Sequence, residues 1–404
     1  KEKLAENGEY NLTGDRYRVV EKRKRQKWPM VKLGEVCELI RGITYSKEDE
    51  VEENGYPVLR ANNINLDGTL NFDEVKQISK KVNLNENKKL KKGDIFICLA
   101  SGSKEHIGKV TFIDNDIDYY FGGFMGVIRT LNNEILNSKY LFLNLKNSKF
   151  NEYLRIQISG VNINNLNSKI LYEFQIPLPP LEVQQEIVAE IEGYQKIIDG
   201  CKQVIDAWKP DVETYLDEEL KTYLAEHPEK QEELAEGWPM VKLGEVFKLT
   251  SGKFLPQKEQ VEGDYLVYGG NGISGKHNKY FLEKPTLIIG RVGEYCGSVH
   301  ITMPKSWVTD NALLVSEYFI NVEQRYLLFV LTNLEINKYA KRGGQPSVSQ
   351  STIYSLSIPL PPLEVQQRIV DKIEAERKVM DSLREMVKTY EEKIKRLIDK
   401  VWGE

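Results

Sequence analysis

A glycine-rich stretch comes closest to a known chemical motif in this 404-residue sequence. Gly270, Gly275 and Lys276 have the spacing of a phosphate-binding loop, in which backbone N–H groups and a lysine side chain hold the phosphates. The following residue is His277, whereas that loop needs a serine or threonine hydroxyl there to bind Mg²⁺. We therefore predict no nucleotide site, and interpret the glycines as a loop that lies close to another backbone, including that of DNA.

The residue types that bind metals or act as nucleophiles are scattered along the chain. The histidines form no HExxH motif, the cysteines form no CxxC pair, and no GxSxG turn is present. This pattern predicts neither a metal site nor a catalytic centre, and it predicts that the cysteines are buried thiols. The residues concerned are His106, His227, His277 and His300, and Cys37, Cys98, Cys201 and Cys296.

The composition indicates a folded protein with more than one core. Hydrophobic residues make up 41% of the sequence, and the length suggests two to four domains. The start is charged and no apolar run is long enough to cross a bilayer, so we expect a cytoplasmic protein without membrane contact. The net charge of −4 argues against a surface coated with phosphate, but short basic runs at 88–92 and 339–342 allow DNA binding by a few loops.

Two motifs occur twice, in the same order. Residues 28–36 and 238–246 both have the sequence WPMVKLGEV, 210 residues apart. Residues 176–192 and 358–374 share the pattern IPLPPLEVQQxIVxxIE, 182 residues apart. The interval between the motifs is therefore 28 residues shorter in the second copy, and there the sequences diverge. We term the two motifs of each copy its frame.

Between the motifs, short β-branched or aromatic runs bounded by Gly, Asn and Asp predict strands. A weaker internal match predicts one short helix in each copy, at 139–145 and 325–331. These elements predict two α+β domains related by the internal repeat. The strands are expected at 93–99, 119–121 and 126–129 in the first copy, and at 285–290, 298–301 and 312–315 in the second.

After each Pro-Pro pair the apolar spacing changes to the 4-3 pattern of a coiled coil. Each helix is expected to be about 40 residues long, and Pro210 to kink or end the first one. Glu376 interrupts the second seam. Because neither helix can bury a one-sided seam alone, we expect the two to pack antiparallel. The seam residues are Ile187, Ile191, Tyr194, Ile198, Cys201, Ile205 and Trp208 in the first helix, and Ile369, Ile373, Met380, Leu383, Val387, Tyr390, Ile394, Leu397 and Val401 in the second.

These features divide the sequence into six segments. The first is a basic arm, which we interpret as solvated; a contact with the end of the second helix or with a partner is the alternative. The segments are the arm at 1–27, a first domain at 28–180, a first helix at 181–227, a linker at 228–237, a second domain at 238–362 and a second helix at 363–404.

The repeated MVKLGEV and PLPPLEVQQ motifs and the duplicated 4-3 helix resemble the specificity (S) subunits of type I restriction-modification systems. The resemblance covers residues 28–402. It implies that each variable domain is a target recognition domain that binds half of a two-part site in double-stranded DNA. It also implies that the helices form an antiparallel coiled coil, which spaces the half-sites and docks two methyltransferase (M) subunits, and that restriction (R) subunits join for cleavage.

The resemblance further implies that S-adenosylmethionine, ATP and Mg²⁺ bind to the partner subunits and not to this chain. The sequence has neither the glycine-rich cofactor turn nor the (Asn/Asp)-Pro-Pro-aromatic motif of an adenine methyltransferase. We therefore expect a non-catalytic subunit. Two alternatives stay open: a single-chain modification enzyme with its own recognition domains, and a coiled-coil adaptor that binds protein.

Within the variable domains, Asn, Gln, Arg, Lys and Ser in loops are the residues suited to contact base edges. The last such loop of each copy lies just before the Ile-Pro-Leu-Pro-Pro motif, and the two loops are therefore equivalent. The candidates are Arg60, Asn62, Asn63, Ser103, Lys104, Lys109, Asn162, Asn164 and Asn165 in the first domain, and Asn271, Lys276, His277, Arg291, Lys341, Arg342, Gln345, Ser347, Ser349 and Gln350 in the second.

Overall fold

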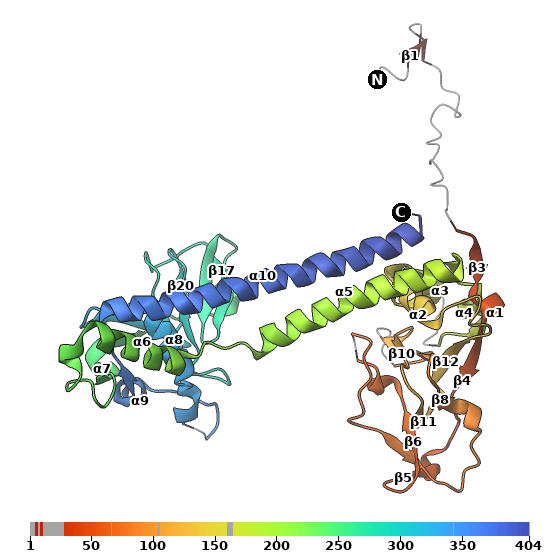
Figure 1. Ribbon diagram of the computed structural model, residues 1–404, viewed down its shortest axis with the longest axis horizontal. Helices are drawn as coiled ribbons and strands as arrows, with labels where there is room; N and C mark the ends of the chain where they lie inside the picture. Colours follow the sequence, from red (N-terminus) through yellow and green to blue (C-terminus); the bar gives the residue numbers. More distant parts are fainter. Residues whose placement is uncertain are drawn as a thin grey trace. The chain divides into compact units, whose positions relative to one another are not determined.

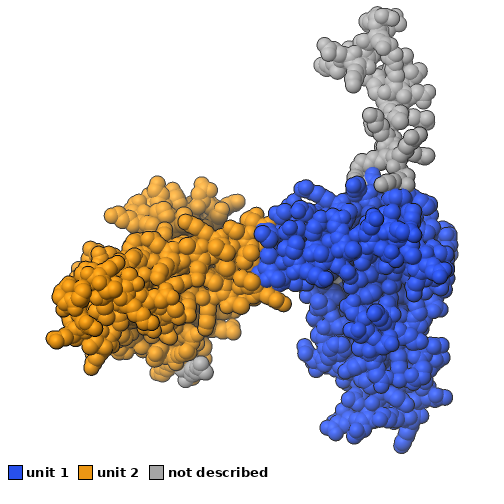
Figure 2. Space-filling model, viewed as in Figure 1, with its two compact units in different colours: residues 1–201, 386–404 blue, residues 202–385 orange. Residues whose placement is uncertain are grey.

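The computed structural model describes residues 5–6, 9–10, 28–65, 67–102, 106–159, 165–341 and 343–403, with the backbone alone at 5–6, 9–10 and 158–159. Most of the basic arm at 1–27 therefore lies outside the described residues, apart from the antiparallel pair β1 (Ala5–Glu6) and β2 (Glu9–Tyr10). The chain divides into two compact units, residues 1–201 with 386–404 and residues 202–385 (Figure 2).

The frame closes each domain as a two-stranded antiparallel ladder. In the first unit, β3 (Met30–Lys32) pairs with β13 (Gln175–Pro177). In the second unit, β14 (Met240–Lys242) pairs with β22 (Ser357–Pro359) in the same register. The two motifs that the sequence repeats are thus bonded to each other in each copy, although more than 100 residues separate them.

A buried glutamine from the EVQQ part of the frame reinforces each closure. The amide of Gln184 accepts a hydrogen bond from the Asn137 backbone N–H at 2.9 Å and donates to the Pro179 carbonyl at 2.8 Å and to the Ile135 carbonyl at 2.9 Å. Its counterpart Gln366 accepts from the Glu323 N–H at 2.9 Å and donates to the Pro361 carbonyl at 2.8 Å.

The first unit is built on a four-stranded antiparallel sheet in the order β10-β9-β12-β4 (Figure 1). Along β9 (Ile95–Cys98), Ile95 and Ile97 face a core shared with the helices, whereas Phe96 and Cys98 face a core shared with a second sheet. Both faces are buried, which explains the continuous apolar run. The other elements of this sheet and its helices are β4 (Cys37–Arg41), β10 (Val110–Phe112), β12 (Met125–Thr130), α1 (Leu33–Val36), α2 (Ser138–Lys146), α3 (Ser148–Ser159) and α4 (Ser168–Glu173).

The second sheet of the first unit has five strands in the order β5-β7-β6-β11-β8. It mixes orientations, since β11 is parallel to β6 and antiparallel to β8. Its strands are β5 (Glu50–Val51), β6 (Tyr56–Leu59), β7 (Lys76–Ile78), β8 (Lys89–Leu90) and β11 (Ile117–Phe121). The 3₁₀ turn η3 (Lys47–Asp49) precedes them, and η4 (Ala61–Asn63) and η5 (Glu86–Lys88) lie between them.

The second unit repeats the four-stranded sheet in the equivalent order β19-β18-β21-β15. Its second sheet has three strands, in the order β17-β16-β20, which accounts for part of the shorter interval between the motifs. The elements are α7 (Leu243–Val246), β15 (Phe247–Ser251), η8 (Gln257–Glu259), β16 (Tyr265–Gly269), β17 (Gly272–His277), β18 (Leu287–Gly290), β19 (Val299–Ile301), β20 (Trp307–Val308), β21 (Ala312–Tyr318), α8 (Gln324–Asn333), η9 (Ile336–Tyr339) and α9 (Gln350–Ser355).

The predicted break at Pro210 is confirmed. The first helix, α5 (Leu181–Ala207), ends before this proline, and α6 (Val212–Glu226) begins after it with Asp211 as N-cap. The expected helix of about 40 residues is thus two helices of 27 and 15 residues, followed by η7 (Pro228–Lys230). The second helix, α10 (Leu363–Val401), is continuous over 39 residues.

The helices pack antiparallel in both units, as predicted. In the first unit, the rings of Tyr194 and Tyr390 lie 5.2 Å apart, and Cys201 Sγ lies 3.8 Å from Met386 Sδ. Residue numbers therefore increase along α5 where they decrease along α10. In the second unit, the start of α10 packs against α6 in the same sense, since Arg368 pairs with Glu226 and Lys372 with Glu218.

The polar seam residue Glu376 has a structural explanation. Its carboxylate accepts hydrogen bonds from Trp208 Nε1, at 3.1 Å, and from the Tyr215 hydroxyl. Burial and the bond to Glu376 raise the pKa of Tyr215 to about 12. Glu376 therefore bonds to residues on both sides of the helix break. An apolar side chain at this position would leave those two donors without this hydrogen-bond acceptor.

Two further predictions concern the whole chain. The four cysteines are buried thiols, as predicted, and burial raises the pKa of Cys37 to about 12. No helix in the part of the chain that the structure describes combines the length and the apolar character needed to span a bilayer.

Candidate nucleic-acid interface

The turn between β11 and β12 gathers the predicted DNA-contacting loops of the first domain. The Phe124 carbonyl in this turn accepts hydrogen bonds from the backbone N–H groups of Leu99, at 2.9 Å, and Ala100, at 3.0 Å. The Gly122 N–H donates to the Leu59 carbonyl at 2.9 Å, next to Arg60. The turn thus joins the ends of β9 and β6, where two of the predicted loops begin.

The third predicted loop meets the same place. The Leu166 N–H donates to the Leu99 carbonyl at 2.6 Å, and Ala100 forms a β-bridge with Asn165. Lys109 also lies here, because its carbonyl accepts from the Cys98 N–H at 3.0 Å. We define the first recognition edge as Arg60, Ala100, Lys109, residues 122–124 and Asn165.

The second domain has the same arrangement with different residues. The Asn311 carbonyl accepts from the Arg291 N–H at 2.8 Å, and the Thr309 N–H donates to the Tyr268 carbonyl at 2.8 Å. The Arg291 carbonyl in turn accepts from the Val348 N–H at 2.9 Å. We define the second recognition edge as residues 269–271, Arg291, residues 309–311, Gln345 and Ser347, which forms a β-bridge with Val292.

One glycine in each domain makes this close packing possible. A Cβ atom on Gly42 would lie 2.1 Å from the Gly122 carbonyl oxygen, and one on Gly252 would lie 2.1 Å from the Thr309 carbonyl oxygen. Both contacts are with backbone atoms, which cannot rotate away. Only glycine fits at these two equivalent positions.

The glycine-rich stretch that resembled a phosphate-binding loop is a tight hairpin between β16 and β17, with Gly269 paired to Gly272. A phosphate-binding loop precedes a helix, and this stretch lies between two strands. A Cβ atom on Gly270 would lie 3.0 Å from the Asn311 carbonyl oxygen. The prediction that these glycines allow close approach to another backbone is confirmed, and that backbone belongs to the chain itself.

Most of the described candidates for base contact have accessible side chains. Lys276 lies at the end of β17 away from the hairpin turn, so it is not part of the second recognition edge. Ser349 caps α9 by accepting from the Thr352 N–H. The exposed candidates are Asn62, Asn165, Asn271, Lys276, Arg291, Lys341, Gln345 and Ser349, and those of intermediate exposure are Arg60, Lys109, Ser347 and Gln350.

Two candidates are buried and bonded within the domain. Asn63 is fully buried; its Oδ1 accepts from the Arg60 N–H at 2.8 Å, and its Nδ2 donates to the Asn71 carbonyl at 3.2 Å. His277 is 6% exposed, and its Nδ1 accepts from the Val261 N–H at 3.1 Å. Their side chains serve the fold, so the prediction of base contact is corrected for both. The candidates Ser103, Lys104, Asn162, Asn164 and Arg342 lie outside the described residues.

The sequence reasoning missed the turns at 122–124 and 309–311, which hold the predicted loops together in each domain. The signal for the first was the Gly122-Gly123 pair between two predicted strands. Arg60, beside this turn, has a buried Nε without a hydrogen-bond partner among the described residues. The buried Nε cannot be reached by a ligand, but the side chain is partly exposed and the guanidinium has further N–H donors, which suit a ligand that supplies acceptors, such as a guanine base.

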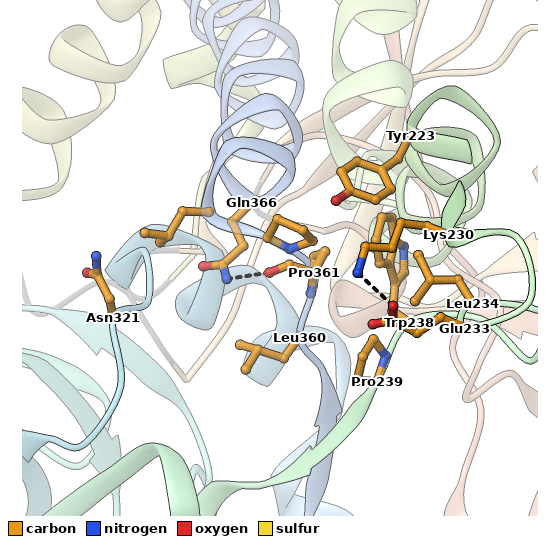
Figure 3. Close-up of a pocket in the computed structure, with 12 residues that line it drawn as sticks. Tyr223, Lys230, Glu233, Leu234, Trp238, Pro239, Asn321, Leu360, Pro361 and Gln366 are labelled. Carbon is orange, nitrogen blue, oxygen red and sulfur yellow. Dashed lines mark hydrogen bonds and ion pairs between the residues drawn. The ribbon is translucent and has the colours of Figure 1, made fainter. Parts of the chain in front are cut away.

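A cavity of about 340 Å³ lies elsewhere in the second unit, between the two motifs of the frame (Figure 3). Trp238 and Pro239 line one side and Leu360, Pro361 and Gln366 another. None of its lining residues belongs to the second recognition edge. In the described part of the chain, no group of three or more His, Cys, Asp or Glu side chains is placed to hold a metal ion.

The comparison with known families agrees with this geometry. A family model described as the type I restriction modification DNA specificity domain matches residues 25–207 and 235–386, one match for each copy of the repeat. The chain belongs to this family. The resemblance found in the sequence is confirmed, and with it the assignment of the chain as a specificity subunit and not an enzyme.

Individual relatives span nearly the same length. The chain is 24% identical over 385 residues to the type I restriction enzyme StySPI specificity subunit of Salmonella potsdam, covering 86% of this chain and 81% of that one. It is 25% identical over 414 residues to the MjaVIII specificity subunit of Methanocaldococcus jannaschii, covering 93% and 91%.

Two solved structures share the fold. The S subunit of the type I restriction-modification system from M. genitalium has a TM-score of 0.53 at 16% identity, covering 95% of this chain and 98% of that one. A chain from a study of complex assembly and conformational transition of the type I R-M system has a TM-score of 0.58 at 21% identity, covering 93% and 97%. The predicted α+β repeat with antiparallel helices is therefore an architecture that these proteins share.

Proposed function

We propose that this chain is the sequence-specific DNA-binding subunit of a type I restriction-modification complex, and that each recognition edge contacts one half of a two-part target. The observation that carries this proposal is the pair of equivalent edges, which have the same backbone hydrogen bonds and different side chains. The backbone hydrogen bonds that the two edges share hold the loops in place. The side chains that differ between the edges can then contact base edges and specify the DNA sequence.

The proposed contacts follow from side-chain chemistry. Arg60 and Arg291 are suited to guanine, and Asn62, Asn165 and Gln345 to adenine, because these side chains form bidentate bonds with those bases. The lysines Lys109, Lys276 and Lys341 suit phosphate or guanine contacts. Asn271, Ser347, Ser349 and Gln350 complete the proposed set.

The helices are proposed to bind the partners. Two M subunits, which hold S-adenosylmethionine, would dock along α5 and α10, and R subunits with ATP and Mg²⁺ would complete the complex in the cytoplasm. The repeated helix sequence supports this proposal, because a duplicated surface suits two copies of one partner. The division into six segments, with 28–180 and 238–362 as target recognition domains, is part of the same proposal.

The test is methylome sequencing of cells that express this chain together with the M subunit of its complex. We expect adenine methylation of one motif made of two short half-sites with unspecified bases between them, and none from either protein alone. A matched strain carries Asn165→Ala with Gln345→Ala, and its motif should be relaxed in both half-sites. Methylation by the purified chain alone would favour a single-chain enzyme, and the absence of any motif would favour a protein-binding adaptor.

A further inference from the structure

Each domain exposes one phenylalanine at or beside its recognition edge: Phe124 belongs to the first edge, and Phe254 follows Lys253, which bonds to Val308 next to the second edge. Phe124 in the first domain is 74% exposed and Phe254 in the second is 73% exposed, and they are the two most exposed large hydrophobic side chains among the described residues. A single exposed apolar residue is ordinary on a protein surface. Two of them at the same end of two repeated domains require a common explanation.

The two phenylalanines lie in different units, on two segments that are hydrogen-bonded to each other within each domain. The N–H of Ile43 donates to the Phe121 carbonyl at 2.7 Å, and the N–H of Lys253 donates to the Val308 carbonyl at 2.9 Å. The next residue is Thr44 in the first domain and Phe254 in the second. Conversely, the position of Phe124 in the first turn is taken by Asn311 in the second. Each domain thus places one phenyl ring at its edge, but from a different segment.

Hydrogen bonds fix the backbone that presents each ring. The Phe124 carbonyl accepts from two N–H groups, those of Leu99 and Ala100. Beside Phe254, Lys253 is held at two points. Its carbonyl accepts a hydrogen bond from Trp307 Nε1 at 3.1 Å, and its side-chain Nζ lies 4.4 Å from the centre of the Phe281 ring. A rigid aromatic side chain loses little conformational entropy on binding, which makes it an effective contact residue.

The surroundings of the rings indicate what they contact. A basic side chain suited to base edges lies near each ring: Arg60 lies beside Gly122, two residues before Phe124, and the Arg291 guanidinium donates to Ser251 Oγ at 3.5 Å, three residues before Phe254. These arginines would contact acceptor atoms on base edges. The apolar groups that DNA presents next to those acceptors are the thymine methyl group and the face of an unstacked base. The phosphates offer a phenyl ring no apolar partner, and a contact with a sugar would carry no information on the base.

We propose that Phe124 and Phe254 are specificity residues that each make an apolar contact with one base, Phe124 in the first half-site and Phe254 in the second. This inference rests on the proposed DNA-binding function. It assigns to each domain one apolar determinant in addition to its polar ones.

The experiment uses the complex of the full chain with its M subunit and a duplex carrying the two-part motif found by methylome sequencing. Phe124→Ala and Phe254→Ala should each weaken binding to the target about tenfold. Binding to unrelated DNA and the salt dependence should stay unchanged, because a phenyl ring carries no charge that pairs with phosphate.

Matched controls come from the opposite end of the same four-stranded sheets. Leu131, after β12, is 60% exposed and bonds through its N–H to the Val36 carbonyl; Phe319, after β21, is 51% exposed and bonds in the same way to Val246. Leu131→Ala and Phe319→Ala should bind the target like the unmodified chain. All four variants should keep the unfolding temperature, because the side chains removed are exposed.

Modified duplexes distinguish the two apolar groups. Uracil in place of each thymine removes one methyl group at a time, and an abasic site removes one base face. Modification of one position in the first half-site should weaken binding of the duplex by the unmodified complex. Phe124→Ala should weaken binding to that modified duplex no further. In the second half-site, Phe254→Ala should behave in the same way. If the effects of uracil and of the Phe→Ala change on affinity are not additive, the ring contacts the thymine methyl group. If only the abasic site shows this non-additivity, the ring contacts the base face.

Phenylalanine variants that bind the target as tightly as the unmodified complex, or that couple to no modified position, would overturn the inference while the proposed function stands. A complex that binds no two-part target would overturn both.

Discussion

The two recognition domains keep the same central sheet and differ in what surrounds it. The sheets β10-β9-β12-β4 and β19-β18-β21-β15 are equivalent strand by strand, and both are closed by the same two-stranded ladder. The second sheet has five strands in one domain and three in the other. The side chains at the recognition edges also differ, although the backbone hydrogen bonds that join the loops are the same. The comparison teaches that loop placement and loop chemistry are separate properties of this fold.

A second difference concerns the helix that packs on the start of each long helix. In the first unit this partner is the end of α10, which contributes the apolar residues Ile394, Leu397 and Val401. In the second unit the partner is α6, which contributes apolar residues and also Glu219. The Glu219 carboxylate forms ion pairs with Arg368 and Lys372 of α10. One junction is thus apolar and the other partly ionic. The predictions below test whether the two domains respond alike where they share a feature and differently where they do not.

The largest expected effect comes from the paired glycines. Gly42→Ala and Gly252→Ala would each place a Cβ atom 2.1 Å from a backbone oxygen, so the turn at the recognition edge must move. We expect each to lower the free energy of unfolding by about 3 kcal/mol, the upper end for an overpacked core. Urea unfolding is the measurement, and Gly193→Ala in α5, where nothing lies within 4 Å, is the control expected to stabilise. Unequal losses in the two domains would show that the edges are not built alike.

The frame glutamines give the next largest effect. Gln184→Leu and Gln366→Leu remove buried amides that bond to backbone groups near the Pro-Pro pair, leaving those groups unpaired. We expect a loss of about 2 kcal/mol for each, somewhat more for Gln184, which also bonds to the Ile135 carbonyl. Gln195→Leu, on the exposed side of α5, should change stability little. A greater loss for Gln366 than for Gln184 in urea unfolding would contradict this order.

Arginines at the edges test the comparison on DNA. Arg60→Ala should relax base preference in the first half-site and Arg291→Ala in the second, each with a roughly tenfold loss of affinity, which is about 1.4 kcal/mol. The readout is competition binding of the assembled complex to targets with single changes in each half-site. Arg325→Ala on α8 is the matched control. An effect of either edge variant on both half-sites would show that the domains do not act independently.

The smallest effect concerns pH and only the second unit. Burial raises the pKa of Glu219, but the hydrogen bonds from Lys372 and Arg368 outweigh burial, and the pKa lies below its ordinary value of 4.5. A lowered carboxyl pKa contributes stability that is complete above the ordinary value and is lost as pH falls through the folded value. Glu219→Gln should therefore cost about 1 kcal/mol at pH 7 and remove this part of the acid sensitivity.

Urea unfolding between pH 3 and 7 measures this effect, with the exposed Glu229→Gln as control. Val401→Ala, at the apolar junction of the first unit, should lower stability equally at every pH. An unchanged pH profile for Glu219→Gln would show that the ionic junction does not contribute.

The sequence was sufficient for the repeat and for the helices. Two copies of each motif predicted a pair of related domains, and the 4-3 spacing with Pro210 predicted the helices and their break. The pairing of the two motifs as a ladder was not predicted, because strands of three residues are too short to show an alternating pattern. The loops at the edges could be listed by residue type, but their convergence could not, because it depends on hydrogen bonds between segments such as Leu99 and Leu166 that share no sequence pattern. Asn63 and His277 failed as candidates for the same reason: a polar residue in a turn has the same sequence signature whether it faces solvent or bonds to the neighbouring backbone. Phe124 and Phe254 were missed because an apolar residue at a strand end is ordinarily expected inside.

The ladders β3–β13 and β14–β22 bring the entry and exit of each domain side by side. Whatever lies between the two strands can therefore be lengthened, shortened or exchanged without changing where the chain enters and leaves. The 28-residue difference between the copies is one example of this tolerance. In evolutionary terms each domain is a cassette, and the near-identical sequences at its borders are natural points for recombination. A lineage that exchanges such cassettes can replace a whole recognition edge in a single genetic event, while the helices α5, α6 and α10 are inherited unchanged.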